Sequence, residues 1–196
     1  MPKCPARSFH NKAPEHIPEA LRPALGPILE TIGSLTQRIR QYDCKLETIS
    51  REHYPETDHL RQIEGIGPLT ALTFVLTLED PHRFEESRSV GACLGLVPAT
   101  DQSGDRDPQR CISKEGDEML RKLLVGSAHY ILGPFGSDSD LRRHGEKIAS
   151  RGGKNSKKRA VVAVARKLSV LLHSLWVSGE LYEPLRNAHR SGGQAA

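Results

Sequence analysis

The sequence has no long hydrophobic run and no apolar segment near its first residue. Its longest uncharged apolar stretch of note, residues 160–165, meets Arg166 and Lys167 after six residues, whereas a membrane span needs about 20. A secretory signal also requires an apolar segment, and the first residues are rich in proline and polar groups. These absences favour a cytoplasmic protein with no membrane partner.

Paired cysteines, metal-binding histidine spacings and aromatic residues are also scarce or absent. The four cysteines, at positions 4, 44, 93 and 111, form no C-x-x-C pair, so neither a disulfide framework nor a zinc site is predicted. The nine histidines follow no metal-ligand spacing, and we expect this chain to bind no metal or other cofactor itself. With 5% aromatic residues, a platform that stacks single-stranded bases is disfavoured.

Strand signals are almost absent from the 196 residues, and helical periodicity recurs along most of the chain. The predicted fold is therefore mostly α: a long coiled-coil helix followed by a compact helical domain. The predicted divisions are a flexible lead-in over residues 1–16, the coiled-coil helix over 17–54, the helical domain over 55–186 and a disordered tail over 187–196.

One apolar stripe dominates the first part of the chain. Apolar residues from Leu21 to Ile49 recur with spacings that alternate strictly between four and three residues. This heptad pattern is typical of a helix that pairs with a second helix in a coiled coil. The alternative is an amphipathic helix packed on its own domain, which usually shows a wider stripe.

A Gly-x-Gly turn follows at Gly65 and Gly67, and Pro68 opens the next helix. Such a turn at a helix N-terminus resembles the hairpin of helix-hairpin-helix DNA-binding proteins, whose exposed amides bind a phosphate without reading sequence. The two glycines are therefore candidate DNA-binding residues. A plain packing corner between two helices explains the same pattern.

Positive charge is concentrated between Arg142 and Lys167. This stretch contains ten Lys or Arg and one acid, a net +9, whereas the whole chain carries +4. Such asymmetry is typical of a surface that binds a polyanion, although a solvated surface also accounts for it. Cations at a helix start oppose the helix dipole, which favours a bound phosphate there. The candidate DNA-binding residues in this stretch are Lys154, Lys157, Lys158 and Arg159.

The stretch 95–116 shows no periodicity and contains a serine beside a glycine, Ser103-Gly104. Long loops inside compact domains are often functional. An activated serine hydroxyl could attack a phosphorus atom, and neighbouring cations would stabilise the transition state. Those candidate DNA-binding cations are Arg106, Arg110, Lys114 and Arg121. From the residues alone, the simpler interpretation of Ser103 is an ordinary turn residue.

The order and spacing of several motifs resemble the C-terminal half of the Piv/MooV-type insertion-sequence transposases, the one-ten/one-sixteen/nine-zero-two family. The resemblance covers about residues 18–186. The motifs that carry it are Ile63-Glu-Gly-Ile-Gly-Pro-Leu-Thr-Ala71, Leu78-Glu-Asp-Pro81 with Phe84, Val90-Gly-Ala-Cys-Leu-Gly-Leu-Val-Pro98, Gln102-Ser-Gly104, Ile112-Ser-Lys-Glu-Gly-Asp117, Leu120-Arg-Lys-Leu-Leu124 and Ala163-Val-Ala-Arg-Lys-Leu168.

The resemblance implies a transposase that joins a RuvC-like domain with four acidic metal ligands to a C-terminal domain through a coiled coil. It also implies a serine nucleophile, here Ser103, and a guide (bridge) RNA that pairs with DNA. No counterpart of the acidic domain is present in this sequence, so Mg²⁺ is expected only in that missing domain.

Three hypotheses follow from these patterns. The first is a DNA transposase in truncated or split form, inactive alone. The second is a non-catalytic nucleic-acid-binding and dimerisation module that modulates intact transposase. The third is a purely structural helical dimer. The implied partners are DNA, guide RNA, and a second copy or an intact transposase subunit, in a cytoplasmic, nucleoid-associated setting.

Overall fold

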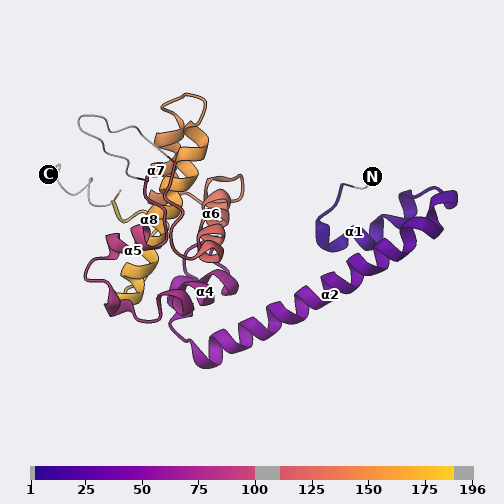
Figure 1. Cartoon of the computed structure of the whole chain (residues 1–196), viewed down its shortest axis with the longest axis horizontal. Helices are drawn as coiled ribbons and strands as arrows, with labels where there is room; N and C mark the ends of the chain where they lie inside the picture. Colours follow the sequence, from indigo (N-terminus) through magenta and orange to yellow (C-terminus); the bar gives the residue numbers. More distant parts are fainter. Residues whose placement is uncertain (1–2, 100–110, 188–196) are drawn as a thin grey trace. The chain divides into compact units, whose positions relative to one another are not determined.

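The structure is a computed structural model that describes residues 3–99 and 111–187. Eight α-helices occur in these ranges, with short 3₁₀ turns at Pro14–His16, Glu19–Leu21 and Pro81–Arg83 (Figure 1). The helices are α1 (Ala6–Lys12), α2 (Arg22–His53), α3 (Thr57–Leu60), α4 (Pro68–Leu78), α5 (Ser87–Cys93), α6 (Glu118–Leu132), α7 (Asp140–Ala149) and α8 (Ser156–Ser178). The described residues contain no strand beyond one isolated bridge, so the mostly-α prediction is confirmed.

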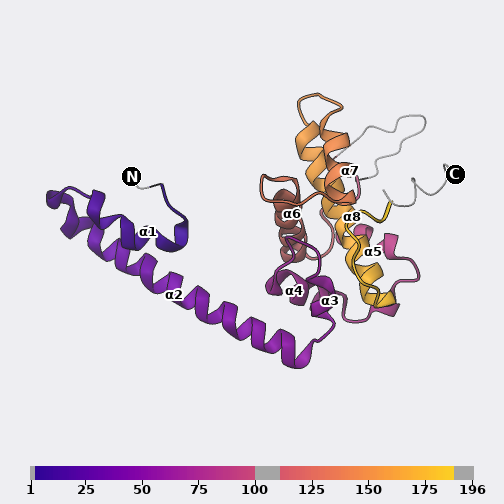
Figure 2. The ribbon, with the colours of Figure 1, turned by 180° about the vertical axis from the view of Figure 1, so that it is seen from behind.

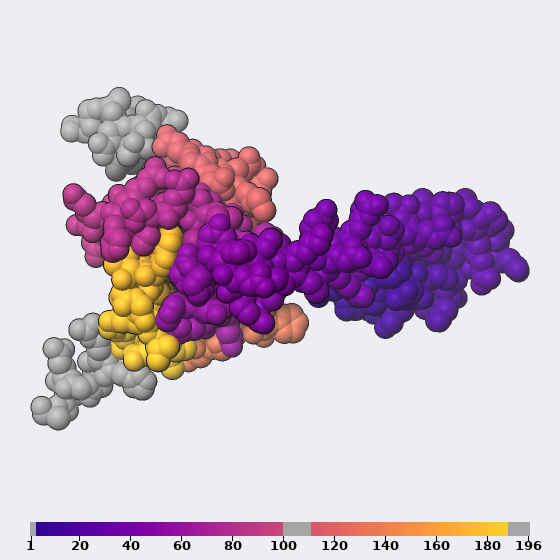
Figure 3. All heavy atoms as spheres, turned by 90° about the horizontal axis from the view of Figure 1, so that it is seen from below, coloured from indigo at the N-terminus to yellow at the C-terminus, as the bar shows by residue number. Residues whose placement is uncertain are grey.

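The chain divides into two compact units, Met1–Ile49 and Ser50–Ala196. In the first unit, residues predicted as a flexible lead-in form α1 and a 3₁₀ turn instead. Ala13 is fully buried and Ile17 nearly so, because the segment folds back beside the start of α2 (Figure 3). The 32-residue helix α2 begins at Arg22 and not at residue 17. Pro18 and a 3₁₀ turn delay its start.

The predicted heptad stripe lies on α2, and much of it is exposed. Ile39 and Tyr42 are 58% and 64% exposed. The other exposed members of the stripe are Leu21, Ile28, Leu35 and Ile49. A row of large apolar side chains exposed to water is unfavourable. Pairing of this face in a coiled coil remains a prediction.

In the second unit, α8 packs against α5, α6 and α7 (Figures 1 and 2). Its inward side chains are small and branched apolar groups, which allow close helix packing. The fully or almost fully buried members are Ala160, Val161, Val164, Ala165, Leu168, Leu172 and Leu175. By length and composition α8 is the one described helix that could cross a membrane, but half of its most apolar window is buried in this core.

A buried histidine ties the far end of α8 to the segment before α5. His173 is 1% exposed, and its Nε2 donates to the Pro81 carbonyl at 2.8 Å. Because a carbonyl only accepts, Nε2 carries a proton, and Nδ1 lies 2.9 Å from the Ser87 hydroxyl, which can donate or accept. The Phe84 ring meets the imidazole edge-on. Both ring nitrogens are therefore satisfied, as burial requires.

The close approach of α7 to its neighbours depends on Gly145. A Cβ there would lie 2.6 Å from Leu132 Cδ2 of α6 and 2.7 Å from Val164 Cγ2 of α8. A side chain at this position would require Leu132 and Val164 to shift.

We predict that Gly145→Ala lowers the free energy of unfolding by about 1–3 kcal/mol, because the added methyl group overpacks the α6–α7–α8 junction. Gly126→Ala is the matched control, since no heavy atom lies within 4 Å of a Cβ on this helical glycine. That change should leave stability unaltered or raise it by up to about 1 kcal/mol. Urea unfolding followed by circular dichroism measures both; equal midpoints would contradict the packing argument.

Candidate nucleic-acid interface

The Gly-x-Gly turn joins α3 to α4, and its two glycines have different surroundings. Gly65 has φ +90°, and a Cβ there would lie 2.9 Å from the Tyr130 ring of α6. Gly67 has open space around it and precedes α4 as its N-cap, with no side chain capping the helix. Gly65 therefore serves packing, whereas Gly67 leaves amide donors at the start of α4 accessible. The helix before the turn, α3, is a single turn of four residues.

Backbone hydrogen bonds join residues 95–99 to residues 111–114, on either side of the residues around Ser103, and we call these two segments the neck. Pro98 and Ile112 form an antiparallel bridge, and the Ala99 amide donates to the Cys111 carbonyl at 2.9 Å. Ser113 donates in the same way to Val97. Three of the predicted residues, Ser103, Arg106 and Arg110, lie outside the described ranges, so only the two segments of the neck on either side of them are described.

Arg121, predicted to contact DNA, donates hydrogen bonds to two backbone carbonyls next to the neck. Its Nη1 donates to the Leu94 carbonyl at 3.2 Å and to the Glu115 carbonyl at 2.9 Å. One guanidinium nitrogen thus joins the end of α5 to the chain entering α6. The same junction leaves no space for side chains at two glycines, since a Cβ at Gly116 would lie 2.0 Å from the Cys93 oxygen and one at Gly95 2.3 Å from the Glu115 oxygen.

Lys114 stands on the same neck with an exposed side chain and a φ of +60°, a backbone conformation that lysine rarely adopts. Its amide donates to the Gly95 carbonyl at 3.2 Å, so the hydrogen bonding of the neck holds this conformation. The side chain forms no ion pair with a described residue. Of the four cations predicted around Ser103, Lys114 is the one described as open to a ligand.

The other predicted cations gather where α8 begins. Lys154, Lys157, Lys158 and Arg159 are all exposed. The first turn of α8 contains no acidic residue, and its N-cap Asn155 makes no capping hydrogen bond. Free amides and unpaired cations at the same helix end form a surface suited to an anion.

The chain from residue 147 to residue 179 contains eight Lys and Arg and no Asp or Glu. None of the eight forms an ion pair with any residue in the described ranges. They are Lys147, Arg151, Lys154, Lys157, Lys158, Arg159, Arg166 and Lys167. Unpaired cations in this number, without a carboxylate among them, create a strongly positive local field.

Two arginines counted in the basic stretch have structural roles that the sequence pattern did not reveal. Arg142 Nη1 donates to the carbonyls of Ile131, Gly133 and Gly136, and its Nε pairs with Glu146. Arg143 donates from Nε to Asp138 Oδ1 at 2.9 Å and from Nη2 to Asp138 Oδ2 at 2.6 Å. That hydrogen-bonded pairing lowers the pKa of the Asp138 carboxyl. The surface available to a polyanion therefore begins at residue 147.

Asp138 precedes α7 without capping it. Ser139 is the N-cap of α7 and accepts from the Arg142 amide at 3.2 Å. Asp138 is one residue too early for that role and binds Arg143 instead.

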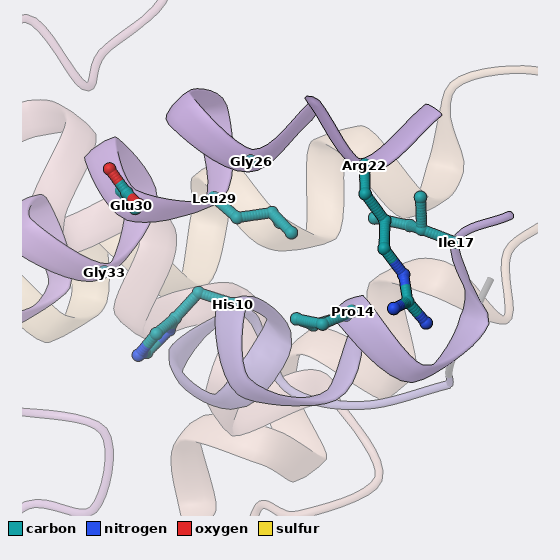
Figure 4. Close-up of a pocket in the computed structure, with 8 residues that line it drawn as sticks. All are labelled: His10, Pro14, Ile17, Arg22, Gly26, Leu29, Glu30 and Gly33. Carbon is teal, nitrogen blue, oxygen red and sulfur yellow. The ribbon is translucent and has the colours of Figure 1, made fainter. Parts of the chain in front are cut away.

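A cavity in the first unit lies between α1 and α2. It has a volume of about 360 Å³, and Figure 4 shows Pro14 and Leu29 near its middle, with Arg22 toward one end and the His10 ring toward the other. His10 Nδ1 is buried and has no hydrogen-bond partner among the described residues. The lining contains no carboxylate other than Glu30 and no hydroxyl group. No group of acid, base and nucleophile is assembled there.

Within residues 3–99 and 111–187, no group of three or more His, Cys, Asp or Glu side chains could hold a metal ion. The chemistry that these ranges offer is cationic. It consists of exposed lysines and arginines at the start of α8, where no side chain caps the helix.

Known proteins match much of this chain. Residues 57–134, from α3 through α6, match the family described as Transposase IS116/IS110/IS902. The chain is 32% identical over 147 residues to the transposase for insertion sequence element IS1111A of Coxiella burnetii, covering 74% of this chain and 39% of that protein. It is 34% identical over 103 residues to the transposase for IS1328 of Yersinia enterocolitica, covering 53% and 28%.

The chain thus spans well under two thirds of the length of these relatives. The matched region contains the Gly-x-Gly turn, both segments of the neck, the intervening residues 100–110 and Arg121. On this match, and on relatives that align over most of its length, the chain is a member of the IS116/IS110/IS902 family of transposases.

Proposed function

We propose that this chain supplies the serine-bearing part of a DNA transposase, with Ser103 as the nucleophile of strand cleavage and joining. In that step the Ser103 hydroxyl loses its proton and forms a bond to a DNA phosphorus. The bond from that phosphorus to one deoxyribose oxygen breaks, and the sugar leaves as a hydroxyl. The observation that carries the proposal is the family match across residues 57–134, which includes Ser103 and the neck on both sides of it.

We propose further that the metal ions and the guide RNA act through a RuvC-like domain outside these 196 residues. Support comes from the relatives, which are named transposases and extend well beyond the part that this chain covers. On this proposal the chain binds DNA in the nucleoid but is inactive until that domain is added.

The DNA backbone would be held mainly by the cations at the start of α8. Lys154 and the run from Lys157 to Arg159 are exposed and unpaired, and the adjacent amides lack a capping side chain. Gly67, at the open start of α4, offers a second set of amides. Contacts of this kind bind phosphate without reading base sequence, so target choice would lie elsewhere.

We propose a second copy of the chain, or an intact transposase subunit, as the partner of the α2 stripe. Its exposed heptad face runs from Leu21 to Ile49, long enough for four heptads. A mixed pair with intact transposase is the basis of the alternative function, in which the chain binds DNA without cleaving it. The two functions differ in one outcome, which is a covalent link between Ser103 and DNA.

Ser103→Ala is predicted to abolish covalent protein–DNA adducts while leaving DNA affinity unchanged, because the hydroxyl forms the bond but does not carry the binding charge. The assay combines the chain, a guide RNA and the part of a relative that this chain does not cover with a suicide DNA substrate. Ser113→Ala, a hydroxyl deletion on the described neck, serves as the control. Adducts that persist in the Ser103 variant would contradict the assignment, and binding without adducts in any variant would favour the alternative function.

Replacing Lys157, Lys158 and Arg159 together by Gln should weaken duplex DNA binding by about ten- to a hundredfold at about 0.1 M salt, since each lost phosphate contact also ends the release of a counterion. The control removes the same charge from α2, by replacing Arg38, Arg40 and Lys45 with Gln. Fluorescence anisotropy measures both variants. Equal losses would show that net charge alone governs binding and would contradict a role for the start of α8.

Ile39→Asp should convert the dimer to monomers, because it places a charge in the middle of the paired stripe and raises the dissociation constant by about a hundredfold or more. Gln41→Asp adds the same charge beside the stripe and should leave the dimer intact. Sedimentation equilibrium distinguishes the two results. A wild-type chain that stays monomeric throughout would exclude pairing of this face with its own copy.

A further inference from the structure

A half-buried histidine on α7 is surrounded by cations from α7, from the turn that follows it and from α8. This group, termed the His144 cluster, consists of His144, Lys147, Arg151 and Lys167. His144 and Lys147 lie one helical turn apart on α7. Lys167 belongs to α8, which Gly145 holds close to α7 because that position has no room for a side chain.

The acidic groups near this cluster have other partners. Glu146 pairs with Arg142 at 2.9 Å and Asp138 with Arg143 at 2.6 Å. Asp140 accepts a hydrogen bond from the Asn187 amide. The charged groups that lower the pKa of His144 are Lys167 from α8, Arg151 from the turn after α7 and Lys147 from α7 itself. The His144 cluster is therefore a set of uncompensated positive charges.

This environment keeps the imidazole uncharged. Burial is the largest cause and the three neighbouring cations add to it, so the pKa of His144 falls below its ordinary value of 6.5. At neutral pH the free protein presents a neutral ring between cations. A negative charge bound among them would reverse this balance, because it would favour the protonated ring.

We propose that the His144 cluster binds a phosphodiester of a nucleic-acid backbone and takes up one proton at His144 when it does so. The inference rests on the proposed nucleic-acid function and extends it to residues outside the start of α8. The proton comes from solvent and converts the imidazole to an imidazolium, which then faces the phosphate together with three cations. The contact depends on the charge of the phosphate and not on the identity of the sugar, so both duplex DNA and duplex RNA would bind.

Proton uptake makes binding depend on pH with a definite sign. The pKa of His144 is higher in the complex than in the free protein, so the complex binds more protons. Affinity is then greatest below the free-protein pKa and declines as pH rises through the pKa of the complex. Each unit by which binding raises the pKa changes affinity by up to about tenfold across this range.

The experiment measures dissociation constants of the full chain for a short duplex DNA and a duplex RNA at about pH 5.5 and about pH 8, where His144 changes charge. We expect binding about three- to tenfold tighter at the lower pH for both duplexes. In His144→Gln the difference should largely disappear, with affinity at low pH falling to the high-pH value. His82→Gln removes an exposed histidine of the Pro81–Arg83 turn and should retain the full dependence.

A direct readout accompanies the binding data. The NMR titration of the His144 ring should shift to higher pH when duplex is added, while circular dichroism confirms that both variants fold. Salt-dependent binding that is indifferent to pH, or that keeps its pH dependence in His144→Gln, would overturn this inference alone. Absence of salt-dependent binding at either pH would overturn the proposed function together with it.

Discussion

The second unit depends on α8, whose two sides have different roles. The inward side of α8 is apolar and forms the shared packing surface of α5, α6 and α7. Its outward side and the turn before it carry lysines and arginines with no carboxylate among them. Burial of the apolar side provides the stability that lets unpaired cations stand together, since their mutual repulsion opposes the folded state. The same helix therefore supports both the fold and the positive surface.

Arginine has two distinct uses in this chain, and separating them defines the interface. Arg121 and Arg142 donate to backbone carbonyls at the ends of helices, where unsatisfied acceptors accumulate. Arg151, Arg159 and Arg166 have no such partners among the described residues. The first set fixes the neck around residues 100–110 and the α6–α7 corner, and the second set remains available to an anion.

Periodicity and helix-start residues predicted most of the architecture. Pro68 begins α4, as the sequence predicted. The sequence could not predict that residues 6–12 fold as a helix beside α2, because they show little periodicity and are held by tertiary burial of Ala13 and Ile17. It also could not distinguish Arg142 from Lys147, since both are cations in one run and only three-dimensional neighbours separate them. Ser103 stays a prediction that depends on family resemblance.

The account depends most on the claim that the stretch from residue 147 to residue 179, which contains no carboxylate side chain, holds a nucleic-acid backbone. The most direct test is the slope of log affinity against log salt concentration for the unmodified chain and a duplex DNA of random sequence. Contacts to four or more phosphates predict a slope of about −4 or steeper, because each contact contributes about −0.9. A slope near zero, or no measurable binding at low salt, would contradict the account.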